Sequence, residues 1–198
     1  MEQDNISNTT KITLPEIMVF AGPNGSGKST ITSMAKTVGV YINADDIKKA
    51  NLCSDLEAAV LAEKFRESAL SKRIDFTFET VLSTDRNLKL LKKAKEAGYF
   101  IRVIYVLTSN PDINVSRVKA RVASGGHDVP ENKIRSRYEK ALKLIPEAIK
   151  VSDIFHIYDN TQTPFRIFKK RKTIFFKWSN KYWTDDKIIE LTNIENFY

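Results

Sequence analysis

One stretch near the N-terminus constrains the fold of this chain more than any other. Residues 17–21 form a short apolar run, which is typical of a buried parallel strand, and a glycine-rich segment follows it directly. From Gly22 to Ser29 that segment fits the pattern Gly-x-x-x-x-Gly-Lys-Ser, and a helical pattern comes next. This order of strand, loop and helix predicts a phosphate-binding loop in an α/β domain that binds a nucleoside triphosphate.

The residue types of the loop suit contact with phosphate. Gly22, Gly25 and Gly27 allow tight turns that bring backbone N–H groups against phosphate oxygens. We expect the ammonium of Lys28 to contact the β- and γ-phosphates and the hydroxyl of Ser29 to bind Mg²⁺. ATP and Mg²⁺ are therefore the predicted cofactors. The predicted nucleotide-binding residues are Gly22, Pro23, Asn24, Gly25, Ser26, Gly27, Lys28, Ser29 and Thr30.

Composition is that of an ordinary protein with one α/β domain. The chain has 198 residues, of which 42% are hydrophobic and 28% are charged. The most apolar run, residues 99–107, is too short to span a bilayer, and the polar segment Met1–Asp4 lacks the features of a signal peptide. Cys53 is the single cysteine, which excludes an internal disulfide. We therefore expect a cytoplasmic location and no membrane partner.

The net charge of +8 is concentrated near the C-terminus. Seven basic residues and no acidic residue lie between Arg166 and Lys181, and aromatic residues are interleaved with them. Such a mixture can bind single-stranded nucleic acid. We favour strands packed on the domain, with aromatic side chains inward and lysines outward, so that nucleic acid is not an expected partner. The predicted division is a phosphate-loop domain over residues 1–163 and a basic, aromatic extension over residues 164–198, packed on the same domain.

Strand and helix patterns alternate along the chain after a polar lead-in at residues 1–14. Alternation of this kind predicts a parallel sheet of about five strands with helices on both faces. The predicted strands cover residues 17–21, 40–42, 74–78, 99–107 and 154–158, and the predicted helices cover residues 28–39, 54–72, 85–97, 110–125 and 130–150.

Acidic residues follow two of the predicted strands. Asp45 and Asp46 come after the second strand, and Glu79 and Thr80 come after the third. Ligands bind beyond the carboxyl ends of the strands in an open parallel sheet, so these side chains should meet the phosphates. A carboxylate there could hold Mg²⁺ or accept the proton of an attacking hydroxyl. Asp45 is the better candidate for the base, because it comes first and adjacent side chains do not both point into one site.

Two arginines, Arg117 and Arg121, lie one turn apart on a predicted helix that ends at the turn Gly125-Gly126-His127. Guanidinium groups match phosphate oxygens, so this pair suits a lid over phosphates, although a solvated helix face is the alternative. The chain has only two histidines, His127 and His156, and lacks the Cys/His spacing of a metal site.

Several of these segments together resemble the zeta-toxin family, over about residues 16–160. The loop is generic, whereas Ile-Asn-Ala-Asp-Asp-Ile at residues 42–47 and Gly-Gly-His-Asp-Val-Pro at residues 125–130 are more specific. The pair Glu79-Thr80 and the two arginines add to the likeness. The resemblance implies a kinase that uses ATP and Mg²⁺ to phosphorylate UDP-N-acetylglucosamine or a related UDP-sugar. Many members are toxins that a small antitoxin protein neutralises.

The resemblance also implies roles for single residues. Lys28 matches the loop lysine, Ser29 the Mg²⁺ ligand and Asp45 the catalytic base. Glu79 matches an acidic residue that holds the sugar nucleotide, and either Arg117 or Arg121 matches an arginine that acts on the transferring phosphate. His127 stands where better-known members have another basic residue. The predicted catalytic residues are thus Lys28, Asp45, Arg117 and Arg121, and the predicted substrate-binding residues are Asp46, Glu79, Thr80 and His127.

Two other functions fit the same sequence. One is a kinase of this fold with another acceptor, such as a different nucleotide, a nucleoside or a small metabolite. The other is an ATP-gated protein that binds nucleic acid through the basic tail. A hydrolytic switch usually has a strand that ends in an Mg²⁺-binding aspartate, and the predicted strand at residues 99–107 ends without one. That difference favours a kinase.

Overall fold

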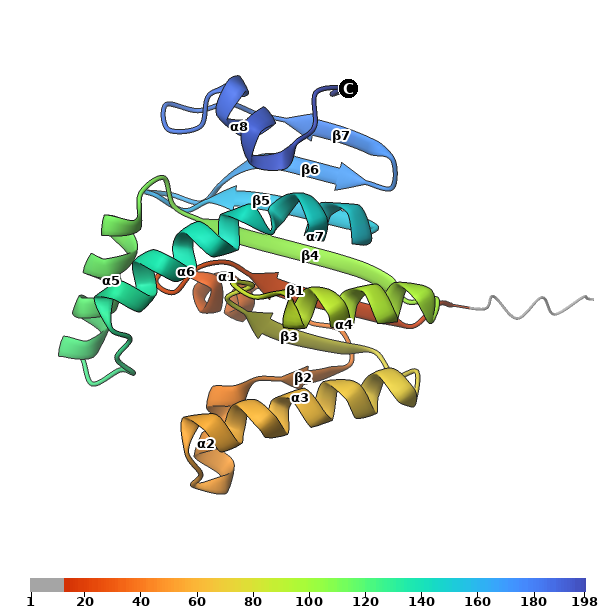
Figure 1. The fold of residues 1–198 in the computed structure, drawn as a ribbon, viewed down its shortest axis with the longest axis vertical. Helices are drawn as coiled ribbons and strands as arrows, with labels where there is room; N and C mark the ends of the chain where they lie inside the picture. The colour runs from red at the N-terminus through yellow and green to blue at the C-terminus, as the bar shows by residue number, and fades with distance from the viewer. Residues whose placement is uncertain (1–12) are drawn as a thin grey trace, which may run out of the picture.

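The computed structural model of the protein describes residues 13–198, so the predicted lead-in lies almost wholly outside the described residues. A seven-stranded sheet in the order β2-β3-β1-β4-β5-β6-β7 forms the centre of the molecule (Figure 1). The strands are β1 (Glu16–Ala21), β2 (Val40–Ile42), β3 (Phe76–Thr80), β4 (Phe100–Leu107), β5 (Ile154–Asp159), β6 (Phe165–Arg171) and β7 (Ile174–Lys177). The helices are α1 (Lys28–Met34), α2 (Ala44–Asn51), α3 (Asp55–Ser71), α4 (Asp85–Glu96), α5 (Pro111–Ala123), α6 (Glu131–Lys143), α7 (Ile145–Val151) and α8 (Asp185–Thr192).

Strands β1 to β5 pair in parallel, and this confirms the predicted α/β fold class. The sheet has two strands more than the five expected, because β6 and β7 extend it with antiparallel pairing. The strand predictions outside this extension agree with the structure to within a few residues.

Local side-chain chemistry sets several helix boundaries. Ser54 and Glu57 form the capping box of α3, in which the Ser54 hydroxyl accepts from the Glu57 N–H and the Glu57 carboxylate accepts from the Ser54 N–H. The helix predicted over residues 130–150 is in fact two helices, α6 and α7. Pro146 lies in the first turn of α7, where its missing N–H costs nothing, and it cannot continue the α6 hydrogen bonds.

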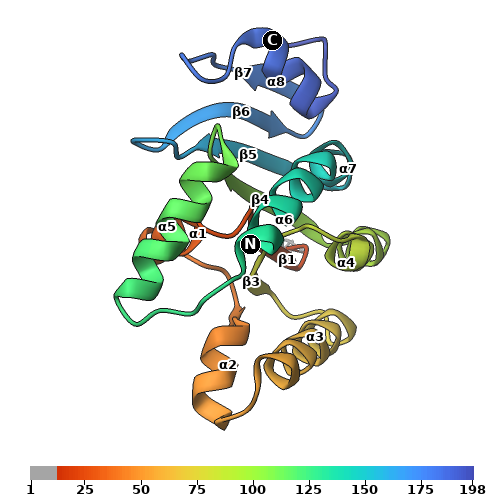
Figure 2. The same ribbon diagram turned by 60° about the vertical axis from the view of Figure 1, so that its left-hand side comes forward.

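One face of the sheet carries the main hydrophobic core. Phe76, Phe78, Tyr105 and Phe155 are fully buried on this face, because alternate side chains of each strand point to the same side. Helices α3, α4, α7 and α8 cover it, and α1 lies on the opposite side of β1 (Figures 1 and 2). Burial of this apolar surface is the main driving force for folding, and it fixes the strand ends that form the site.

The C-terminal segment continues the sheet, and its two faces differ. Phe168 of β6 and Trp183 are buried in the main core together with Ile188 of α8. Lys170 is also buried, whereas Trp178 is exposed. The expected pattern of aromatic side chains inward and lysines outward therefore describes only part of this segment, because strand alternation sends neighbouring side chains to opposite faces. In the part of the chain that the structure describes, no helix is both long and apolar enough to cross a membrane.

Candidate active site

The phosphate loop joins the end of β1 to the start of α1, and its glycines are required by close contacts. Gly22 and Gly27 have φ angles of 139° and 91°, which other residues rarely adopt. A Cβ atom on Gly22 would lie 1.9 Å from the carbonyl oxygen of Val106 in β4, and one on Gly27 would lie 2.2 Å from Nδ2 of Asn160. The loop conformation is therefore accessible only with glycine at these positions.

Two asparagines that the sequence analysis missed hold the loop from behind. Nδ2 of Asn114, in α5, donates to the carbonyl oxygen of Asn24 at 2.6 Å. Nδ2 of Asn160, directly after β5, donates to the carbonyl oxygen of Ser26 at 2.7 Å. Asn114 is fully buried beside Val115, and a polar residue on an apolar helix face is the signal that could have identified it. Because these carbonyls are occupied from behind, the loop N–H groups are left to face a ligand.

Lys28 folds back over the loop. Its Nζ donates to the carbonyl oxygens of Gly22 and Pro23 at 2.7 and 3.0 Å. Burial lowers the pKa of this ammonium to about 8, while Glu79 and Asp45 raise it and Arg121 lowers it further. The side chain is thus close to three other predicted site residues, and an arriving anion would stabilise its charged form.

A cavity of about 470 Å³ brings most of the predicted site residues together at this edge of the sheet. Asp45 of α2, Glu79 and Thr80 of β3, and Arg117 and Arg121 of α5 line it opposite the loop. The cavity therefore combines backbone donors, cations and carboxylates in one space, as expected beyond the carboxyl ends of parallel strands. Its loop lining consists of Asn24, Gly25, Gly27, Lys28, Ser29 and Thr30.

Glu79 connects the phosphate loop to β2. Its Oε2 accepts from the Ser29 hydroxyl at 3.1 Å and its Oε1 from the Tyr41 hydroxyl at 2.8 Å. Asn43 donates to the same Tyr41 oxygen at 3.0 Å. Burial raises the pKa of Tyr41, so its phenol is a neutral donor at physiological pH. These contacts hold the Glu79 carboxylate beside Ser29.

The oxygen pair of Ser29 and Glu79 fits a magnesium ion that is bound together with a triphosphate. Mg²⁺ takes oxygen ligands, and proteins usually supply only one or two of them, the others being water and phosphate oxygens. Within residues 13–198, no three His, Cys, Asp or Glu side chains gather in a way that could hold a metal without such help. The donors present therefore suit a nucleotide-bound Mg²⁺.

Asp45 and Asp46 lie on different sides of α2. The Asn43 side chain caps this helix by accepting from the Asp45 N–H at 2.8 Å. Asp45 lines the cavity beside the loop, whereas Asp46 lines a separate groove with Val40 and Phe65. The structure thus places one of the two adjacent carboxylates at the phosphate edge.

The remaining predicted residues surround the cavity. Nη2 of Arg121 donates to the carbonyl oxygen of His127 at 2.6 Å, and Nη2 of Arg117 donates to that of Thr161 at 3.2 Å. Both arginines line the cavity, so their position does not distinguish their roles. The His127 side chain lies outside it, with Nδ1 at 4.0 Å from the carboxylate of Asp55. A further cation, Arg137 of α6, donates to the Asn24 side chain at 3.4 Å, a contact the sequence analysis did not assign.

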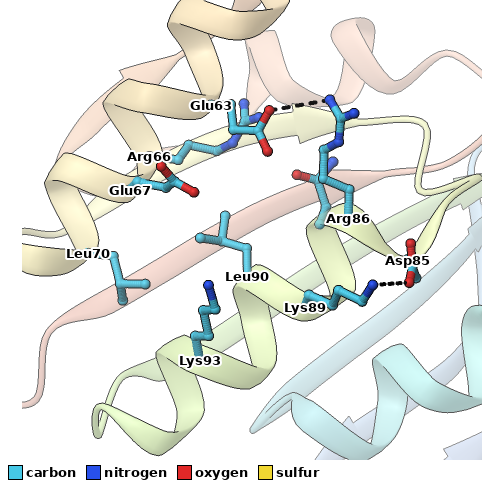
Figure 3. A pocket seen from close by; sticks show the side chains of 10 residues that line it. Glu63, Arg66, Glu67, Leu70, Asp85, Arg86, Lys89, Leu90 and Lys93 are labelled. Carbon is cyan, nitrogen blue, oxygen red and sulfur yellow. Dashed lines mark hydrogen bonds and ion pairs between the residues drawn. The ribbon is translucent and has the colours of Figure 1, made fainter.

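A second cavity, of about 490 Å³, lies between α3 and α4 (Figure 3). Asn87 lines it and donates to the Thr80 hydroxyl at 2.7 Å, so this groove begins beside the first cavity. The buried Arg66 side chain and the ion pair of Arg86 with Glu63, at 3.3 Å, form its walls. Charged walls of both signs suit a polar molecule.

Comparison with known sequences shows two clear similarities. The profile of the family described as Zeta toxin matches residues 2–173. A protein of Haemophilus influenzae, described as uncharacterized, is 34% identical over 125 residues, which represent 60% of this chain and 89% of that protein.

Solved structures share the fold at low sequence identity. One, from a study of the PezAT chromosomal toxin–antitoxin system of Streptococcus pneumoniae, has a TM-score of 0.57 at 16% identity and covers 77% of this chain and 70% of its own. Another, AvrRxo1-ORF1:-ORF2 with ATP, has a TM-score of 0.66 at 14% identity and covers 82% of this chain and 60% of its own. At such identities the likeness shows the fold alone.

Proposed function

We propose that this chain, which belongs to the zeta-toxin family, is an ATP- and Mg²⁺-dependent kinase that phosphorylates a hydroxyl of UDP-N-acetylglucosamine or a related UDP-sugar. The observation that supports it best is the cavity of about 470 Å³, where the phosphate loop meets Asp45, Arg117 and Arg121. A kinase needs a group that accepts the proton of its acceptor hydroxyl, and a carboxylate beside the phosphates meets that need. The family and this combination of groups favour transfer to a hydroxyl over hydrolysis.

Lys28, Asp45, Ser29 and the arginine pair each have one task in the proposed reaction. Lys28 exchanges its bonds to the loop carbonyls for bonds to phosphate oxygens. Asp45 accepts the hydroxyl proton as the acceptor oxygen bonds to the γ-phosphorus and the bond to the β–γ bridging oxygen breaks, which leaves ADP. Arg117 or Arg121 donates to the transferring phosphoryl group, where charge is redistributed. Mg²⁺ held by Ser29 would neutralise charge on the triphosphate.

Glu79 serves both substrates in this proposal. Its contact with Ser29 supports a role beside the metal, and its position at the end of β3 supports the acceptor role that the family resemblance implies. We assign the acceptor to the groove between α3 and α4, since Asn87 of this groove donates to Thr80 of the first cavity and the guanidinium of Arg66 suits a diphosphate. Neither Asp46 nor His127 lines these two cavities, so both lie at the edge of the site. We keep them as proposed substrate contacts.

The acceptor can be tested directly. The protein is incubated with ATP, Mg²⁺ and a panel of UDP-sugars, and mass spectrometry detects products that have gained one phosphate. We expect ADP to form only when an acceptor is present. Phosphorylation of another nucleotide, a nucleoside or a small metabolite would show that the proposed acceptor is wrong and that the protein is nevertheless a kinase. ATP hydrolysis that no acceptor accelerates would contradict the kinase itself.

The base can be tested with a matched pair of variants, Asp45→Asn and Asp46→Asn. General-base catalysis typically contributes 10²–10⁴-fold. Asp45→Asn should therefore lose about 3–5 kcal/mol of transition-state stabilisation, at ~1.4 kcal/mol for each tenfold change in rate. Asp46→Asn should be much milder, because its side chain lines the other groove. The measurement is single-turnover transfer, with titration of ATP as the control. If Asp45→Asn fails only because ATP no longer binds, Asp45 is a metal ligand instead.

We also propose a small antitoxin protein as partner. The matched fold from Streptococcus pneumoniae comes from a toxin–antitoxin system, which supports this expectation. Growth arrest on expression of this chain, relieved by co-expression of the product of a neighbouring gene, is the expected result. Growth unaffected by expression would contradict toxicity. It would not bear on the kinase reaction, which the acceptor screen tests separately.

Two further proposals concern location and domain organisation. The single Cys53 is free, which suits a reducing cytoplasm as the place of action. We keep the division into a kinase domain at residues 1–163 and a basic extension at residues 164–198 that packs on it. The shared core of Phe168, Trp183 and Ile188 supports such packing.

A further inference from the structure

The side chains on one face of β5, β6 and β7 lie at the surface, while helices α7 and α8 cover the opposite face (Figures 1 and 2). The strand register places Tyr158 opposite Arg166, and Lys169 between His156 and Phe176. We call this surface the open face. It consists of His156, Tyr158, Arg166, Lys169, Phe176 and Trp178, all of them half-exposed or exposed.

Two cations of the open face, Arg166 and Lys169, contact aromatic rings and have no acidic partner among residues 13–198. The guanidinium of Arg166 lies 4.8 Å from the centre of the Trp178 ring, and Nζ of Lys169 lies 5.3 Å from that of Phe176. No carboxylate among residues 13–198 lies within 4 Å of either cation. Nε of Arg166 is buried without any hydrogen-bond partner in the described chain. By contrast, Lys177 on the same strand pair is paired with Asp185.

The rings of the open face form two pairs. Phe176 and Trp178 are stacked, with ring centres 6.1 Å apart and planes 13° apart. His156 packs edge-on against Tyr158 at 6.2 Å. Trp178 is 37% exposed, although a tryptophan of a β-extension would normally be buried. The exposed ring and its flanking cations are the features that call for a partner.

The surroundings of His156 show the sign of the local field. Burial lowers the pKa of this imidazole to about 4, and Arg166, Lys169 and Arg102 lower it further. The ring is therefore neutral at physiological pH. Because Arg102 is paired with Glu16 at 2.8 Å, the unpaired positive charge of the open face comes from Arg166 and Lys169.

We propose that the open face binds single-stranded nucleic acid, with bases stacked on Trp178 and Phe176 and phosphates on Arg166 and Lys169. Cations without acidic partners attract phosphates, and any base can stack on an aromatic ring. Some RNA-binding domains stack two or three bases on an open sheet face in this way. Strands lie about 4.8 Å apart, so β5 to β7 offer room for two or three nucleotides. An acidic protein segment would use the cations and leave the rings without a function.

This inference is independent of the kinase reaction and reverses the sequence expectation for the tail. The basic and aromatic residues of residues 164–198 were expected to separate into an outer and an inner set. They are instead mixed on both faces: Arg166, Lys169, Phe176 and Trp178 lie on the open face, whereas Phe168, Lys170 and Phe175 lie on the other.

The test measures fluorescence anisotropy of a labelled 12-nucleotide RNA and of the DNA of the same sequence, with the full chain in 50–200 mM KCl. We expect micromolar affinity and a slope of log K against log[KCl] near −2, since two or three phosphate contacts contribute about −0.7 each. Trp178→Ala should weaken binding roughly tenfold. The double variant Arg166→Gln/Lys169→Gln should reduce the slope by about 1.4.

A matched control makes the same change of charge elsewhere. Lys64→Gln/Lys92→Gln, on α3 and α4 at the other side of the sheet, should keep both affinity and slope. Melting temperatures show that each variant is folded, and Trp178→Phe keeps a stacking ring if the alanine variant is unstable. The proposal fails if neither oligonucleotide binds at 50 mM KCl, or if the open-face variants bind like the control. Capture by phosphatidylserine vesicles without oligonucleotide binding would also overturn it.

Discussion

The phosphate loop and strand β6 each have a desolvated lysine, Lys28 and Lys170, and the two lysines have different surroundings. Nζ of Lys28 donates to the carbonyl oxygens of Gly22 and Pro23 at 2.7 and 3.0 Å, and Nζ of Lys170 donates to that of Ile149 at 2.6 Å. Burial lowers the pKa of both ammonium groups. The bonds are alike, so neither residue type nor hydrogen bonding alone distinguishes a ligand-binding lysine from a structural one.

The difference lies in the space beside each ammonium. Lys28 borders the cavity of about 470 Å³ and has Asp45, Glu79 and Arg121 around it. Lys170 is only 8% exposed, and its acceptors are the carbonyls of Ile149 and Lys150 in the last turn of α7, where the helix leaves carbonyls short of i+4 donors. The Ile149 carbonyl also accepts from the N–H of the cap residue Ser152. Lys28 can therefore exchange its bonds for phosphate, whereas Lys170 completes a helix end.

The largest effect is expected at the arginines of the cavity. An arginine that meets charge on the transferring phosphoryl group contributes on the order of 10³–10⁵ in rate. One of Arg117→Ala and Arg121→Ala should lose turnover on this scale with little change in melting temperature. Lys119→Ala on the same helix removes an exposed ion pair with Glu131 and should turn over normally. Normal turnover by both arginine variants would exclude a catalytic lid.

Lys28→Ala should show the next largest effect. Removal of one donor to a developing charge typically costs roughly 10²–10³ in rate. The variant should fold normally, because it also removes a desolvated charge. Steady-state phosphorylation, together with the melting temperature, checks both expectations. Phosphorylation near the wild-type rate by folded Lys28→Ala would remove the phosphate-loop interpretation.

The contrast between the two lysines also shows which parts of the site the sequence could predict. Asp45 comes shortly after β2, Glu79 lies at the end of β3, and the loop has a fixed spacing, so local order was sufficient to bring them together. Asn114 and Asn160 were missed because they contact the loop across 90 and 134 residues of sequence. Pro146 indicates the break between α6 and α7. The break was not predicted, because the sequence has a helical pattern on both sides of this proline.

The C-terminal segment was harder to predict for a different reason. Its alternation is interrupted, since the pairing of β5 with β6 shifts between Ile157 and Tyr158. A one-residue shift reverses the face of every later side chain. Composition alone could therefore not show that Lys170 would be buried or that Trp178 would be exposed.

Lys170→Met should lower stability and leave turnover unchanged, whereas Lys28→Ala should lower turnover and leave the fold intact. The variant removes the donor to the carbonyls of Ile149 and Lys150, which costs about 1–3 kcal/mol. Part of this cost is offset, because the variant also removes a charge that is desolvated in the folded protein. We expect a net loss of about 1–2 kcal/mol in the free energy of unfolding at pH 7, measured by urea denaturation, on the scale of a buried unsatisfied group. Turnover below the melting temperature should match the wild type. A variant of full stability and poor turnover would place Lys170 in the site.

The smallest effect is a pH dependence that follows from the pKa of Lys28. Burial lowers this pKa from 10.5 to about 8 in the free protein, and a bound triphosphate would raise it again. Nucleotide binds the protonated lysine more tightly, so ATP affinity should fall as the pH rises above about 8. The limiting slope for one proton is tenfold for each pH unit, or about 1.4 kcal/mol. Titration of ATP at pH 7.5 and 9.5 measures it.

The titration of Lys28 should raise stability with pH, whereas it lowers ATP affinity with pH. Its folded pKa lies below its unfolded value of 10.5, so the unfolded chain binds more protons between about pH 8 and pH 10.5. The free energy of unfolding of the nucleotide-free protein should therefore gain a rising contribution in this window, while the affinity for ATP declines. Lys170 adds a slope of the same sign, since burial lowers its pKa too. The readout is thus the difference between wild type and Lys28→Ala, in which the Lys170 contribution cancels. A wild-type affinity that is flat from pH 7.5 to 9.5, with no difference between the two stability slopes, would show that Lys28 does not titrate in this range.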